Sequence, residues 1–183
     1  MEQKLLRQMK QGNKLAMKRF YDANSGYLTA VCLRYMSNKE DVKDVLQESF
    51  IKIFNAIHKF EYRGEGSLRA WSTRIVVNEA LKYIKENEKM SLTTFPTWEL
   101  PDKSDDSEPK FEDIPSSAIL EIIQSLPLGY RTVFNLYVLE QKSHREIAAE
   151  LNISESTSAS QYHRAKNLLV KEIELYKLKE GTQ

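Results

Sequence analysis

Aromatic and basic side chains alternate over residues 60–89 of this 183-residue chain. Aromatic rings stack on unpaired bases and cations contact phosphates, so the mixture is typical of binding to single-stranded nucleic acid. Gly64 and Gly66 predict a mobile loop, and a helix is expected to follow it. Trp71 could stack on a base or pack in the core. A tryptophan within a helix packs in a core more often than it contacts a ligand, so packing is favoured. The side chains with this chemistry are Tyr62, Arg69, Trp71, Arg74, Asn78 and Lys82.

A second group of polar side chains begins the last expected helix. Glutamine can form two hydrogen bonds with adenine, and serine can donate to or accept from a base edge. Arg164 and Lys166 are expected to contact phosphates. Residues 154–171 hold three cations against one acid, which predicts weak DNA binding by this segment alone. The expected base-reading residues are Glu155, Ser156, Ser158, Ala159, Gln161 and Tyr162.

A third group is acidic and lies on the helix expected over residues 40–57. If the apolar stripe of this helix faces inward, Asp44, Gln47, Glu48 and Ile51 share its outer side, three and four residues apart. A solvated helix face is the simplest interpretation. Two carboxylates can also bind metal, but no Glu-x-x-His segment accompanies them, so a di-metal bundle is excluded.

The sequence lacks the residue patterns that several kinds of functional site require. It contains no nucleophile–base–acid arrangement, no Gly-rich phosphate loop and no zinc-ligand spacing, so an enzyme, a metal site and a cofactor are not expected. The single Cys32 lies between apolar neighbours and is expected to be a buried free thiol. No apolar run is long enough to span a bilayer and no secretory signal is visible, which predicts a cytoplasmic protein that is not itself a membrane protein.

Charge and proline divide the chain into three parts. Residues 1–90 hold 17 Lys and Arg against 11 Asp and Glu, residues 91–115 hold 2 against 7, and residues 116–183 hold 8 of each. Residues 91–115 also contain four of the five prolines and no apolar period. We therefore predict two small helical domains, 1–90 and 116–183, joined by an acidic flexible linker at 91–115.

Apolar residues at spacings of three and four predict an all-α fold of three or four packed helices in the first domain. Ser37 and Glu40 are expected to form a capping box for the middle helix. The stripe of the helix before it is Leu15, Phe20, Tyr27, Leu28, Val31 and Leu33; that of the middle helix is Val42, Val45, Leu46, Phe50, Ile53, Phe54 and Ile57; that of the next is Leu68, Trp71, Ile75, Val76, Leu81 and Ile84.

The second domain has the pattern of a helix-turn-helix. Ser116 or Ser117 is expected to cap its first helix, and Pro127 to start the next. Ser143 with Glu146 predicts a capping box, Asn152 a left-handed turn residue, and Ser154 the cap of the last helix. Two short helices joined by a tight turn favour DNA binding, while an ordinary helical hairpin is the alternative.

Taken in order, these segments resemble the bacterial sigma factors of the extracytoplasmic-function (ECF) group, within the RNA polymerase sigma factor superfamily. The resemblance rests on "DVKDVLQESFIKIF", on "FEYRGEGSLRAWSTRIVVNEAL" and on "SHREIAAELNISESTSASQYHRAKNLL". It implies a transcription initiation factor that binds core RNA polymerase, directs it to promoters and assists DNA opening. It also implies a possible partner of another kind, an anti-sigma factor, which is frequently membrane-bound in this group.

The resemblance implies a role for each group of residues. Asp44, Gln47, Glu48 and Ile51 match the segment that docks on the clamp helices of the largest polymerase subunit. Residues 60–67, with Arg63 and Ser67, and the following helix match the part that flips a base and reads the −10 element. The second domain matches the −35 reader, next to the flap region of polymerase. Its implied DNA contacts are Ser143, Glu155, Ser156, Thr157, Ala159, Ser160, Gln161, Arg164 and Lys166.

The last helix departs from the usual pattern of the group. Ala159 replaces a common Lys, Gln161 a common Arg, and Ser158 and Tyr162 replace aliphatic residues. A reader tethered to polymerase needs little affinity of its own, because linked sites raise the effective concentration. The resemblance further implies that the acidic linker threads the polymerase channel that RNA later occupies. There it would imitate the RNA backbone with Asp102, Asp105, Asp106 and Glu108.

Two other functions fit parts of the sequence. A free-standing repressor or activator would use the second domain to bind duplex DNA without polymerase, with a steep salt dependence. A helical adaptor would bind only proteins, and residues 60–67 would then have no role.

Overall fold

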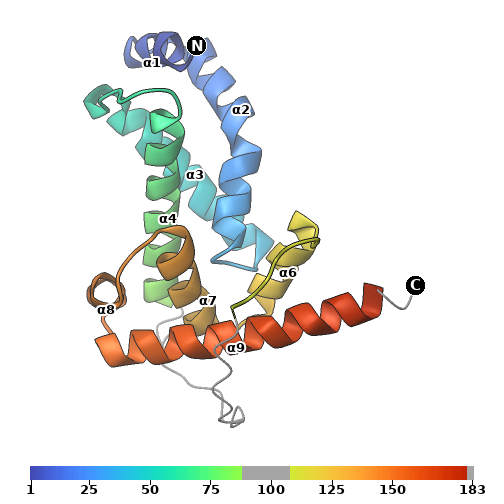
Figure 1. Ribbon diagram of the computed structural model, residues 1–183. Helices are drawn as coiled ribbons and strands as arrows, with labels where there is room; N and C mark the ends of the chain where they lie inside the picture. Colours follow the sequence, from blue (N-terminus) through green and yellow to red (C-terminus); the bar gives the residue numbers. More distant parts are fainter. Residues whose placement is uncertain (88–107, 181–183) are drawn as a thin grey trace. The chain divides into compact units, whose positions relative to one another are not determined.

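The computed structural model describes residues 1–87 and 108–180, and all regular structure within these residues is helical (Figure 1). The expected all-α fold is therefore confirmed. The chain divides into two compact units between Ile84 and Lys85, and each is described by itself. Most of the expected linker, including Asp102, Asp105 and Asp106, lies outside the described residues.

The first unit is built on long helices that bury one apolar stripe each. Largely buried residues at spacings of three and four include Phe20 and Leu28 on one helix, Ile53 on the next, and Val76 on a third. Phe20 contacts Phe50 and Phe54 edge to face, with centroids 6.5 and 6.3 Å apart. The elements are α1 (Glu2–Lys10), α2 (Lys14–Leu33), α3 (Lys39–Ala56), η1 (Ile57–Lys59) and α4 (Ser67–Asn87).

Two details of this unit differ from the sequence prediction. The N-cap of α3 is Asn38, whose side chain accepts from the Glu40 N–H at 2.9 Å, so the capping box expected from Ser37 was wrong. Asn and Ser are nearly equal as caps, and the register of the helix decided between adjacent candidates. Leu15 and Tyr27 are 58% and 41% exposed, so the stripe of α2 is narrower than expected.

The second unit consists of α6 (Ser116–Ser125), α7 (Leu128–Phe134), the π-helical turn η2 (Asn135–Leu139), α8 (His144–Leu151) and the long α9 (Glu155–Glu180). Helices α6, α7 and α8 all pack against α9 (Figure 1). Its core contains Ile114, Ala118, Ile122, Ile123, Leu126, Tyr130, Phe134, Ala165, Leu169 and Ile173.

Local capping chemistry fixes the helix-turn-helix. Ser143 and Glu146 form the predicted capping box at α8, and Asn152 ends α8 with φ 56° and ψ 47°, in the left-handed region. The Ser154 hydroxyl accepts from the Thr157 N–H at 3.0 Å and so caps α9. The cap expected for α6 was wrong, because Pro115 occupies the N-cap position and forms no side-chain bond.

Cys32 is a fully buried free thiol, as predicted. Burial raises the pKa of its thiol to about 12, because a thiolate is poorly solvated in an apolar core. Over residues 1–87 and 108–180, no group of three His, Cys, Asp or Glu side chains is arranged to hold a metal ion. In the same residues, no helix combines the length and the apolar character needed to cross a membrane.

Candidate functional site

The acidic group on α3 lies at the surface of the first unit. Asp44, Gln47 and Glu48 are exposed, and Ile51 is 46% exposed although it is apolar. The spacing of three and four residues brings these four side chains onto one face, as the sequence predicted for a helix. Because all four side chains are exposed, this face can meet another molecule.

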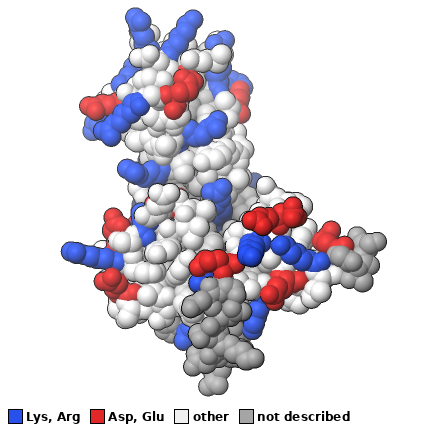
Figure 2. Space-filling model, viewed as in Figure 1, with Lys and Arg blue, Asp and Glu red and all other residues white. Residues whose placement is uncertain are grey.

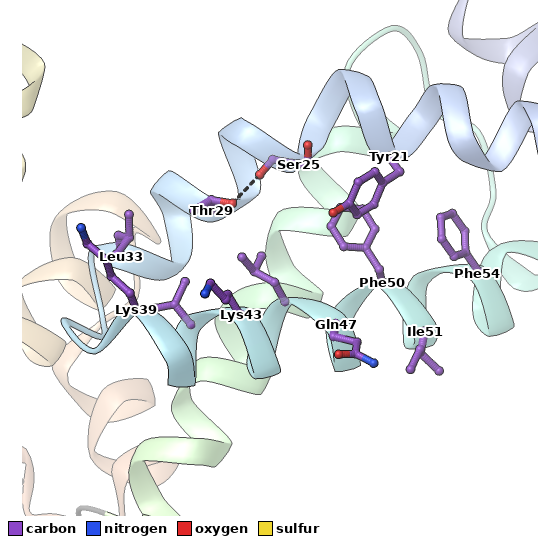
Figure 3. Close-up of a pocket in the computed structure, with 12 residues that line it drawn as sticks. Tyr21, Ser25, Thr29, Leu33, Lys39, Lys43, Gln47, Phe50, Ile51 and Phe54 are labelled. Atoms are coloured by element: carbon purple, nitrogen blue, oxygen red, sulfur yellow. Dashed lines mark hydrogen bonds between the residues drawn. The ribbon is translucent and has the colours of Figure 1, made fainter.

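An apolar groove of about 800 Å³ adjoins this face, and sequence reasoning did not find it. In Figure 3, Tyr21 and Phe50 point toward one another between α2 and α3, and Gln47 and Ile51 project from α3. The ring centroids of Tyr21 and Phe50 are 4.7 Å apart. The groove is further lined by Ser25, Thr29, Leu33, Lys39, Val42, Lys43, Leu46 and Phe54. A surface that combines an apolar groove with carboxylates suits a protein partner with apolar and basic side chains.

Hydrogen bonds within the loop order residues 60–67. The Ser67 hydroxyl donates to the Gly64 carbonyl at 2.6 Å and accepts from the Arg63 N–H at 3.3 Å. Gly64 and Gly66 have φ of +117° and +86°, which side chains rarely tolerate. The Tyr62 hydroxyl lies 3.4 Å from the Glu65 carboxylate. The glycines therefore allow the backbone of residues 60–67 to form a hydrogen-bonded arch.

Helix α4 presents a stripe of polar residues beside this loop. Trp71, Arg74, Asn78 and Lys82 follow one another at spacings of three and four, and the last three are exposed. Trp71 is partly buried and packs on Phe60, with ring centroids 4.9 Å apart. Packing is thus one role of Trp71, and the indole still reaches the surface.

Arg69 lies apart from that stripe, against α2. Its guanidinium donates to the Asn24 side-chain oxygen at 3.2 Å and lies 5.2 Å from the centre of the Tyr27 ring. Tyr27 is 41% exposed. Arg69 and Tyr27 thus form an exposed pair of a cation and an aromatic ring. The sequence did not indicate this pair because the two residues are 42 positions apart.

Basic side chains are numerous at one end of the first unit. On the face shown in Figure 2, Lys and Arg side chains cover much of the end of the first unit that carries α1, with Asp and Glu side chains between them. Such an end attracts a polyanion at long range.

In the second unit the start of α9 presents small polar side chains. Glu155, Ser156, Ala159 and Ser160 are exposed, and Thr157 is partly exposed. Ser143, at the start of α8, is exposed, but its hydroxyl belongs to the capping box. Arg164 is partly buried, with Nη1 donating to the Tyr130 hydroxyl at 3.4 Å.

Three residues expected to face DNA are buried instead. Ser158 is fully buried, with its hydroxyl 3.0 Å from Nδ1 of His144, and Gln161 is only 1% exposed. Lys166 is 8% exposed, and its ammonium donates to the Glu108 carboxylate at 2.9 Å. In this conformation Gln161 and Lys166 are therefore not available to a base or a phosphate, and their expected DNA contacts stay predictions. The spacing could have indicated the burial of Ser158 and Gln161, since Ser158, Gln161, Ala165 and Leu169 lie three and four positions apart and form one buried stripe.

An aromatic stack was also missed from the sequence. The Tyr137 ring lies 4.6 Å from His144 and 4.3 Å from Tyr162, and Phe134 stacks on Tyr162 at 6.4 Å. Burial, followed by the nearby Glu108 carboxylate, raises the pKa of Tyr162 above its ordinary value. These contacts assign Tyr162 to packing rather than to base reading.

Comparison with known proteins gives two family matches that together cover most of the chain. Residues 20–90 match the model of sigma-70 region 2, and residues 116–169 match that of sigma-70 region 4. The matches fall in chain order, one in each helical segment of the chain.

Full-length relatives agree with those matches. The chain is 27% identical to the ECF RNA polymerase sigma-E factor of Haemophilus influenzae, with 94% of this chain and 95% of the relative covered. It is 26% identical to the ECF RNA polymerase sigma factor SigW of Bacillus subtilis, over 94% and 97%. The fold is similar to that of CnrH, solved in complex with the cytosolic domain of CnrY, at 21% identity and a TM-score of 0.50 over 93% and 96% of the two chains.

Proposed function

Because this chain belongs to the ECF group of the sigma-70 family, and so is a transcription initiation factor that directs RNA polymerase to promoters, we propose how its surfaces share that work. The observation that carries the assignment is the presence of sigma-70 regions 2 and 4, in that order, on one chain. Sigma factors act through core polymerase and promoter DNA and have no enzymatic activity of their own.

For docking on core polymerase we propose the exposed face of α3, formed by Asp44, Gln47, Glu48 and Ile51. The adjoining groove supports this proposal, because carboxylates beside an apolar surface fit a partner helix that carries both basic and apolar side chains. We propose the clamp helices of the largest polymerase subunit as that partner, and the flap region as the partner of the second unit.

For the −10 element we propose the arch at residues 60–67 together with the stripe on α4. Tyr62 and Trp71 offer rings to an unpaired base, and Arg63, Arg74 and Lys82 offer cations to the strand. Ser67 holds the arch, and Asn78 lies on the same stripe. Arg69 with Tyr27 extends the surface toward α2.

For the −35 element we propose the exposed start of α9. Ser156, Ala159 and Ser160 are available to base edges, while Glu155 and Thr157 flank them. Their small size and the scarcity of free cations support weak binding by this unit alone. Tethering through polymerase would supply the missing affinity.

Regulation by an anti-sigma partner belongs to the same proposal. CnrH, similar in fold, was solved with the cytosolic domain of CnrY. A partner of this type would cover the α3 face or the start of α9 and would compete with core polymerase. Localisation in the cytoplasm follows from the same proposal, because the polymerase and promoters are there.

Run-off transcription with purified core polymerase on a promoter library tests the function. Addition of the chain should give polymerase a defined −10 and −35 preference that core lacks. A chain that binds duplex DNA tightly without polymerase would instead support a free-standing regulator. Absence of both activities would support an adaptor that binds only proteins.

A further inference from the structure

Helix α1 holds the loop that precedes α4, through a residue far away in sequence. The Glu2 carboxylate accepts two backbone hydrogen bonds, from the Gly66 N–H to Oε2 and from the Leu68 N–H to Oε1 at 2.7 Å. Both donors lie at the junction of the arch at residues 60–67 with α4. The matches to the two sigma-70 region models do not include α1, since the region 2 match begins at residue 20 and the region 4 match at residue 116.

The start of α4 lacks the usual means of capping itself. The first N–H groups of a helix have no partner within the helix, and a side chain at the N-cap position normally accepts one of them. Here that position is Gly66, which has no side chain, and the first turn of α4 contains no acidic residue. The Glu2 carboxylate supplies both the acceptor and the negative charge that a helix N-terminus favours.

The other end of α1 holds the other end of the arch. The Lys10 ammonium donates to the Phe60 carbonyl at 2.6 Å. Leu6 and Met9, between the two polar contacts, are 4% and 1% exposed, so packing fixes α1 on the unit. The arch is thus fastened at Phe60 and at Gly66, both times by α1.

The fastened segment contains the side chains proposed to meet DNA. Desolvation, followed by the Glu65 and then the Glu2 carboxylate, raises the pKa of Tyr62 above its ordinary value. Loss of the Glu2 contact would release the Gly66 and Leu68 amides at one end of the segment that carries Tyr62 and Arg63.

We propose that Glu2 and Lys10 are positioning residues that hold residues 60–67 in the shape that accepts an unpaired base, so that α1 helps to set the base preference at the −10 element. The inference rests on the proposed role of the arch in reading that element. Glu2 does not need to touch DNA, and its negative charge would in fact oppose binding.

The test uses holoenzyme assembled from core polymerase and the full chain carrying Glu2→Gln or Lys10→Met. The matched controls are Asp22→Asn and Lys18→Met, which alter an exposed ion pair on α2. The probe is a single-stranded DNA selected from a random pool by the unaltered holoenzyme, together with versions that carry an abasic site at each position. The measured quantity is the ratio of affinities for the intact and abasic DNAs.

Glu2→Gln should lower this ratio about tenfold at one or two positions, as expected for one lost charge-assisted hydrogen bond. Affinity for the abasic DNA should stay constant or rise, because a negative charge is removed. Hydrogen exchange at the Gly66 and Leu68 amides should accelerate in the same variant. Lys10→Met should lower the ratio at the same positions, and neither control should change it.

Three results would overturn the inference. If both α1 variants keep the ratio of the unaltered holoenzyme, α1 does not position the arch. If intact and abasic DNAs lose affinity equally, the contact supports only the general fold. If the unaltered holoenzyme itself shows no base preference, the proposed −10 role of the arch fails and the inference fails with it.

Discussion

Replacement of Ser143 by alanine separates a structural role of this residue from a DNA contact. The Ser143 hydroxyl accepts from the Glu146 N–H at 3.3 Å and donates to the Glu146 carboxylate at 2.7 Å, which also accepts from the Ser143 N–H at 2.8 Å. Alanine removes the first two bonds and leaves one N–H of α8 without its partner. The resemblance assigns the same hydroxyl to the −35 element, so two explanations compete for one side chain.

The expected cost follows from the capping geometry. Loss of an N-cap serine destabilises a helix by about 1 kcal/mol, and α8 has only 8 residues over which to absorb that loss. A change of this size raises the population of opened α8 about fivefold. Ser143→Thr keeps a hydroxyl acceptor and should change this population by a smaller factor.

Hydrogen exchange of the α8 amides in the full chain measures this population directly. Ser143→Ala should accelerate exchange about fivefold, and Ser160→Ala, an exposed serine on α9, should leave α8 unchanged. A Ser143→Ala chain with unaltered exchange but weaker −35 binding in holoenzyme would refute the capping argument. In that case the hydroxyl acts on DNA.

Other predictions follow from single contacts. Asn152→Ala should destabilise the helix-turn-helix by about 1–2 kcal/mol in urea unfolding followed by a probe in α8, because alanine tolerates a φ of 56° poorly, whereas Asn152→Gly should be close to neutral. Hydrogen bonds from the Ser143 hydroxyl and backbone hold the pKa of Glu146 below its ordinary value of 4.5, so its contribution to stability is complete above that pH and is lost as the pH falls through the lowered pKa. The loss is measurable as lower protection of the α8 amides in acid, with each exchange rate divided by the intrinsic rate at the same pH. Cys32, with its pKa raised to about 12, should react with a chromogenic thiol reagent at pH 8 only after denaturant is added. Charge reversal at Asp44 and Glu48 together should weaken binding to core polymerase by about tenfold or more, and unchanged binding would exclude the α3 face as the docking surface.

The outcome for α9 explains why some sequence predictions failed. A polar residue at the start of a recognition helix was expected to face outward, yet Gln161 and Ser158 lie on the stripe that Ala165 and Leu169 bury. Residue type favoured DNA contact and spacing favoured burial, and spacing was the better guide. Lys166 was missed for a different reason, since its partner Glu108 is 58 residues away.

The sequence by itself determined the features that depend on neighbouring residues: the helical stripes, the capping box of α8, the left-handed turn at Asn152 and the order of two domains. Those features depend on interactions between residues at most a few positions apart, where residue type and spacing are sufficient. Only the tertiary structure decided the groove between Tyr21 and Phe50, the pairing of Arg69 with Tyr27, and the hold of Glu2 on the start of α4. Each of these joins side chains or backbone groups from different helices, and their meeting depends on how the helices pack, which no local pattern encodes.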